Sequence, residues 1–185
     1  MFWQCYNPHV TMITRLAYRS HQFWCALFPT RGGLTSEVLR PYLSPAQQNL
    51  FRRMQPAEQA HAIQVLNHLK AAGFDDPDLL AAALLHDVGK VVVPLSLLER
   101  VLIVLGKRLF PDAVHRWGKG TPRGLHRPFV VAARHTDWGA ELAAQAGASP
   151  LTVELVRRHH AAPEDQAGPA ADRLLAALRS ADGKS

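Results

Sequence analysis

Histidines and aspartates that could bind a metal ion recur from residue 61 onward in this 185-residue sequence. His86 is followed directly by Asp87, and His159 by His160, with further candidates before, between and after these pairs. Each of them ends or interrupts an apolar helical stripe, where a core would otherwise hold Leu or Val. The candidate ligands, in chain order, are His61, His86, Asp87, His135, His159, His160 and Asp182.

The chemistry of these side chains favours divalent metal ions. Imidazole ligands suit Mn, Fe, Co, Ni or Zn, and carboxylates also admit Mg. The two cysteines, Cys5 and Cys25, lie near the N-terminus, so a cysteine-based structural zinc site is disfavoured. Seven ligands exceed what one tetrahedral ion can use, so we expect two ions bridged by Asp87. Two-ion sites hold their ions ~3.5–4 Å apart and suit phosphoryl hydrolysis.

Asp87 follows a segment that should be buried on every side. Residues 79–85 are all apolar, which is typical of a helix in the middle of a core. Burying an unpaired carboxylate is costly, and the partial negative charge at a helix C-terminus adds to that cost. A Lys, an Arg or a metal ion must therefore lie beside Asp87. The metal-free alternative is a local hydrogen bond between His86 and Asp87, or an arginine partner.

Helix-start signals precede the segments that carry most of these residues. Ser or Asp followed by Pro, an N-cap and a first helical residue, occurs at 44–45, 76–77 and 149–150, and Pro56 and Pro169 open two more segments. The predicted helices cover 45–54, 56–72, 77–87, 151–160 and 169–182. The β-branched cluster at 91–93 is cut short by Pro94. The sequence predicts an all-α fold, a single-domain helical bundle.

Composition and charge narrow the class of protein. A hydrophobic fraction of 48% with 19% charged residues excludes a disordered chain. A net charge of +6 permits anionic partners. The most apolar stretch, residues 91–110, is too interrupted to span a membrane. Within it, we interpret residues 97–108 as a core helix with a basic rim; a surface-lying amphipathic helix is the alternative. With two cysteines and no signal peptide, we expect a cytoplasmic protein.

The segment Leu84-Leu85-His86-Asp87-Val88-Gly89-Lys90 and the order H…HD…H…HH…D resemble the HD-domain metal-dependent phosphohydrolase superfamily. The resemblance covers residues 57–182 and implies an all-α bundle with its metal site between helices. We therefore expect an HD domain over residues 57–185. Residues 1–56 would form an N-terminal helical extension packed on it, within one structural domain overall.

Carried over position by position, the resemblance implies that His61, His86, Asp87 and Asp182 hold one ion. Asp87 would bridge to a second ion, held by His135 with His159, His160 or both. Asp172 is the alternative to Asp182, although it stands in the first turn of its helix, where an acid is stabilising anyway. His115 is the alternative to His135.

The resemblance implies hydrolysis of a phosphomonoester or phosphodiester by metal-activated water, with Asp87 and Lys90 as catalytic residues. Lys90 would offset charge on the phosphate, or else be a solvated lysine. We expect a small phosphorylated substrate, a nucleotide, and no stable nucleic-acid partner. The segment after His160 lacks the Gly-Tyr-Pro signature of cyclic-dinucleotide phosphodiesterases. The alternatives are a mixed-valence di-iron oxygenase and a non-catalytic signalling domain.

Overall fold

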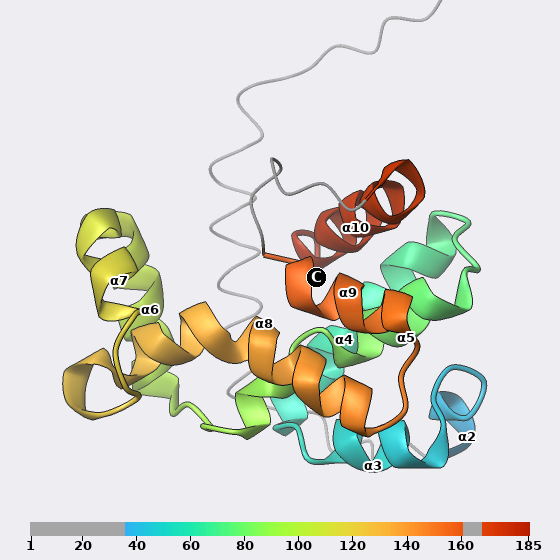
Figure 1. The fold of residues 1–185 in the computed structure, drawn as a ribbon, viewed down its shortest axis with the longest axis horizontal. Coiled ribbons are helices and arrows are strands. Elements are labelled where there is room, and N and C mark those ends of the chain that lie inside the picture. The colour runs from blue at the N-terminus through green and yellow to red at the C-terminus, as the bar shows by residue number, and fades with distance from the viewer. Residues whose placement is uncertain (1–35, 161–167) are drawn as a thin grey trace, which may run out of the picture. The chain divides into compact units, whose positions relative to one another are not determined.

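The computed structural model describes residues 36–160 and 168–185, which belong to one compact unit spanning residues 34–185. Every regular element among them is helical, so the all-α prediction is confirmed (Figure 1). The α-helices are α2 (Ser36–Leu39), α3 (Pro45–Arg52), α4 (Pro56–Ala71), α5 (Pro77–Leu85), α6 (Leu97–Leu109), α7 (Pro111–Trp117), α8 (Arg127–Gln145), α9 (Pro150–Arg158) and α10 (Pro169–Asp182). Two 3₁₀ turns, η2 (Val88–Val91) and η3 (Gly124–His126), connect them. Most of the expected N-terminal extension lies outside the described residues, so the division at residue 56 stays a prediction.

The predicted helix starts are made by side-chain caps. Ser44, Asp76 and Ser149 each accept a hydrogen bond from the backbone N–H three residues later, at 3.3, 2.9 and 3.0 Å. Each is followed by a proline at the first helical position. These short-range bonds satisfy N–H groups that a helix otherwise leaves unpaired. Helices α3 and α5 therefore begin at the predicted residues, and α9 begins at Pro150, one residue before the predicted start.

Helix α5 lies in the middle of the core. All of residues 79–85 are buried, as their apolar character predicts. The helix packs against α4, α9 and α10, while α8 packs against α9 and η2 (Figure 1). It ends at Leu85, two residues earlier than predicted, because the chain turns through His86 and Asp87 into η2. This turn places both polar residues inside the bundle.

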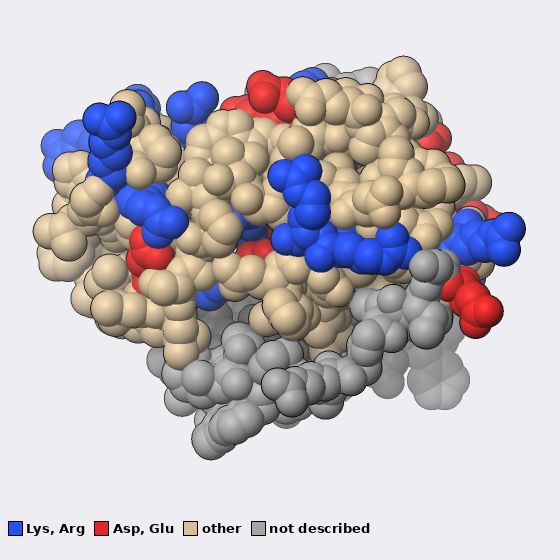
Figure 2. All heavy atoms as spheres, turned by 90° about the horizontal axis from the view of Figure 1, so that it is seen from below, with Lys and Arg blue, Asp and Glu red and all other residues tan. Residues whose placement is uncertain are grey.

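Helix α6 corrects the prediction of a core helix with a basic rim. Only Gly106 is buried, whereas Leu98 and Leu109 are 69% and 61% exposed. The helix packs against α7 and α8, and Lys and Arg side chains gather over the part formed by α6 and α7 (Figure 2). Helix α6 is amphipathic, but the helices that pack against it cover only part of its apolar face. No helix in the described ranges is long and apolar enough to cross a membrane.

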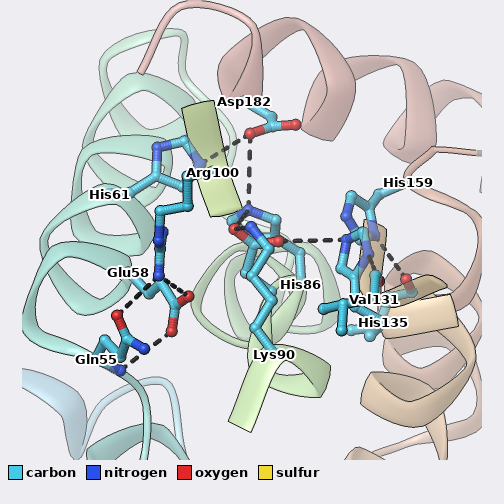
Figure 3. Close-up of polar contacts among 12 residues, drawn as sticks. Gln55, Glu58, His61, His86, Lys90, Arg100, Val131, His135, His159 and Asp182 are labelled. Carbon is cyan, nitrogen blue, oxygen red and sulfur yellow. Dashed lines mark hydrogen bonds and ion pairs between the residues drawn. The ribbon is translucent and has the colours of Figure 1, made fainter. Parts of the chain in front are cut away.

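Two ion pairs hold α6 to the rest of the fold. Arg100 donates to Glu58 of α4 at 2.7 Å and to the Gln55 side chain at 2.9 Å (Figure 3). Arg127 pairs with Glu99 and also donates to a backbone carbonyl at 2.7 Å. The Glu58 side chain is only 4% exposed, so it depends on Arg100 for charge compensation.

We expect Arg100→Ala to lower the free energy of unfolding by about 3 kcal/mol, because it leaves the buried Glu58 carboxylate without its cation. Arg108→Ala removes the same charge from an exposed position of α6 and should cost less than about 0.5 kcal/mol. Urea unfolding followed by circular dichroism measures both. Equal stabilities of the two variants would contradict this role of the Glu58–Arg100 pair.

Candidate metal centre

Five elements bring the seven predicted ligands together around the end of α5. Figure 3 shows five of them, His61, His86, His135, His159 and Asp182. His86 and Asp87 form the turn between α5 and η2, and His61 projects from α4. The other ligands come from the middle of α8, the C-terminal end of α9 and the last turn of α10. They are His135, His159, His160 and Asp182.

The first group of ligands joins α4, α5 and α10. Asp182 Oδ1 lies 2.9 Å from His61 Nε2 and 3.7 Å from His86 Nε2. Ligand atoms of these three residues lie within 4.8 Å of one another, which is close enough for one ion. Burial alone would raise the pKa of Asp182, but the hydrogen bond from His61 lowers it to about 2. The carboxylate is therefore ionised at neutral pH.

The second group consists of three imidazoles. Ligand atoms of His135, His159 and His160 also lie within 4.8 Å of one another. The His159 and His160 ring centroids are 4.2 Å apart, and those of His135 and His160 are 5.3 Å apart. His135 and His159 are buried, while His160 is exposed at the surface. The group therefore opens to solvent on the side of His160.

Asp87 stands between the two groups. Its Oδ2 lies 3.6 Å from His86 Nε2, and its Oδ1 lies 3.5 Å from His135 Nε2. Lys90 Nζ is 2.5 Å from Oδ2 and supplies the cation that the sequence requires. Burial alone would raise the pKa of Asp87, but the charge of Lys90 and the nearby histidines hold it well below its usual range. This carboxylate can contact both groups while staying ionised.

Three buried histidines are oriented by their own helices. Each Nδ1 lies within hydrogen-bond distance of a backbone carbonyl three or four residues earlier. The pairs are His86 with Ala83 at 2.9 Å, His135 with Val131 at 3.2 Å, and His159 with Val156 at 2.7 Å. Because a carbonyl only accepts, Nδ1 must carry the proton, which leaves Nε2 with a free lone pair in the neutral ring.

These Nε2 atoms have no hydrogen-bond partner in the described part of the chain, although all three are buried. Burial lowers the pKa of His86, that of His135 to about 3 and that of His159 to about 4. The rings are therefore neutral at pH 7. A neutral imidazole held by an Nδ1–H bond to a carbonyl is the usual state of a metal-binding histidine. The residues present thus fit the divalent ions that the donor set favours.

The two alternative ligands lie elsewhere. Asp172 is in the first turn of α10, about 15 Å along the helix axis from Asp182. Its Oδ1 lies 3.8 Å from Nη1 of Arg158. His115 is exposed on α7 and belongs to neither group. The geometry therefore favours Asp182 and His135 as ligands.

A glycine contact that the sequence analysis did not assign holds η2 against α8. A Cβ atom placed on Gly89 would lie 1.8 Å from the carbonyl oxygen of His135 and 2.6 Å from the backbone nitrogen of Gly139. Only glycine fits at position 89, and this contact sets the distance between Asp87 and His135. A glycine in the middle of a helix can indicate that another backbone segment packs closely against it. Gly139 in α8 is such a glycine.

The family model of the HD domain matches residues 59–182. The chain belongs to the HD domain family. All seven clustered residues lie within the matched range, and the all-α architecture is that of the family. Membership is consistent with metal-dependent hydrolase chemistry. Comparisons with curated proteins and with solved structures find no match for this chain.

We expect Gly89→Ala to separate η2 from α8, because its methyl group would overlap the His135 carbonyl. The free energy of unfolding should fall by about 3 kcal/mol or more. Gly120→Ala is the matched control, since its nearest contact would be an ordinary 3.8 Å. Thermal unfolding of both proteins tests this, and a Gly89→Ala protein as stable as the control would refute the close contact.

The metal-free protein should lose stability as the pH falls from 6.5 towards 4. The unfolded chain binds protons at His135 and His159 below about pH 6.5, whereas the folded chain does so only near pH 3 to 4. The expected slope is up to about 1.4 kcal/mol per pH unit for each imidazole. Urea titrations at pH 7, 6 and 5 measure it, and His159→Gln should reduce it. A flat profile would be incompatible with buried neutral imidazoles.

Proposed function

We propose that this protein is a metal-dependent phosphohydrolase that acts on a phosphomonoester or phosphodiester, a nucleotide being the expected substrate. The observation that carries the proposal is the set of three buried, unpartnered Nε2 atoms around Asp87. A structural core has no use for such atoms, whereas a metal centre requires them. The family match and the absence of thiols from the ligand set support the same conclusion.

In this proposal, His61, His86 and Asp182 hold one ion, and His135, His159 and His160 hold the other, with Asp87 between them. When bound, divalent ions lower the pKa of water and stabilise negative charge on phosphoryl oxygens. The protein keeps the imidazoles neutral by burial and the carboxylates ionised by nearby positive charge. Both states are required before metal can bind at neutral pH.

Lys90 is the candidate for contact with the substrate. Its side chain is 23% exposed, whereas that of Asp87 is 6% exposed, so Lys90 is the more accessible of the two to a group that enters from solvent. A phosphate approaching the two groups meets this charge first. Lys90 can then donate to a phosphoryl oxygen and offset the charge that develops during hydrolysis.

We expect Asp87→Asn to lose bound metal and at least about 100-fold in phosphate-ester turnover, because the amide cannot supply the bridging negative charge. Asp112→Asn changes an exposed aspartate on α7 and should alter neither. Elemental analysis followed by a phosphatase and phosphodiesterase screen with Mn²⁺ tests both properties on one sample. Full metal occupancy in Asp87→Asn would overturn the proposal. Oxygen uptake by iron-loaded protein without phosphate release would favour the oxygenase alternative.

A further inference from the structure

A pocket of about 560 Å³ opens beside the second group of imidazoles. His160 lines it, so the pocket and the candidate metal centre share a side chain. Its volume is in the range of pockets that bind small-molecule ligands. The part of a substrate that extends beyond the scissile phosphate on this side would therefore enter the pocket.

Positive charge dominates the lining of this pocket. Lys107 comes from α6, and Arg157 and Arg158 come from the last turn of α9. Asp137 is the single carboxylate in the lining, and Ala132 and Ala133 leave room on the α8 side. Cations from two separate helices converge on one hollow, which is an arrangement that attracts an anion.

Arg158 lines the pocket from a buried position and has two carboxylates nearby. It is 9% exposed, and its Nη1 lies 3.4 Å from Glu154 and 3.8 Å from Asp172. Its Nη2 is buried without a hydrogen-bond partner among the described residues. Buried guanidinium groups are normally fully hydrogen-bonded, so this Nη2 is an exception. The two carboxylates offset the charge of Arg158, so direct contacts to an anion must come from the other two cations. Lys107 and Arg157 are exposed and can contact a ligand directly.

Lys107 connects this pocket with the side of the candidate metal centre where Lys90 lies. The side chain of Lys107 is exposed, but its ammonium group is partly desolvated, which lowers its pKa. The positive charge of Lys90 lowers that pKa further, so the two charges act on each other. One phosphate at Lys90 leaves Lys107 and Arg157 available for a second anionic group.

We propose that this pocket binds a second phosphate group of the substrate, so that the substrate class is a nucleotide carrying two or more phosphates. This inference rests on the proposed function, because the first phosphate is the one at the metal centre. Lys107 and Arg157 donate to the second phosphate, and Arg158 forms part of the same pocket lining. Arginine side chains suit this role because they bind phosphate through two parallel N–H groups.

The test compares binding of adenosine 3′,5′-bisphosphate and adenosine 5′-monophosphate to the full-length metal-loaded protein at 4 °C. Lys107→Gln with Arg157→Gln should raise the Kd of the bisphosphate at least 10-fold, and that of the monophosphate much less. Arg108→Gln with Arg173→Gln removes the same charge from exposed positions outside the pocket and serves as the control. Circular dichroism and thermal unfolding verify that both double variants are folded.

Equal weakening of both ligands, or no weakening of either, would overturn the pocket assignment. Turnover on the same samples separates this result from the proposed function. Hydrolysis of phosphate esters without bisphosphate selectivity would refute the pocket alone. Selective bisphosphate binding that depends on Lys107 and Arg157, without any hydrolysis, would support the pocket and refute the proposed activity.

Discussion

The structure depends on keeping three buried imidazoles neutral, with their Nε2 atoms left unpaired in the two ligand groups. His86, His135 and His159 each donate a hydrogen bond from Nδ1 to a carbonyl of their own chain segment. The Nε2 atoms of His86 and His135 lie 3.6 and 3.5 Å from Asp87. Buried polar atoms without partners destabilise a fold unless a ligand satisfies them. The apolar helix α5, the close approach of η2 to α8 and the pairing of Lys90 with Asp87 all serve to maintain this arrangement.

The scaffold and the site share elements, so stability and chemistry are coupled. Helix α4 carries both Glu58, which anchors α6 through Arg100, and His61, one turn further along. Helix α6 in turn carries Lys107 to the cationic pocket. Helix α9 ends in two arginines that line this pocket and leads directly into the His159–His160 pair. A displacement of α6 would therefore alter the substrate side of the centre before the ligands themselves.

The helix starts and the buried position of α5 could be predicted from local sequence signals. A cap residue followed by proline defines a helix start through bonds spanning three residues, and the all-apolar residues 79–85 could only be buried. The sequence requires a cation beside Asp87 but does not identify it, because a Lys, an Arg or a metal ion would each compensate the negative charge. The sequence analysis did not predict the exposure of α6. An amphipathic pattern shows that a helix has an apolar face, but not how much of that face other helices cover. The pocket is lined by residues from α6, α8 and α9. These segments are separate in the sequence, so no local pattern predicts that they meet.

The central claim is that the unpartnered Nε2 atoms are metal ligands. X-ray diffraction from crystals grown with Mn²⁺, measured near the manganese absorption edge, tests it most directly. The account predicts two anomalous peaks, one among His61, His86 and Asp182 and one among His135, His159 and His160, with Asp87 in contact with both. Anomalous density at neither group, or coordination through Nδ1 in place of Nε2, would contradict it.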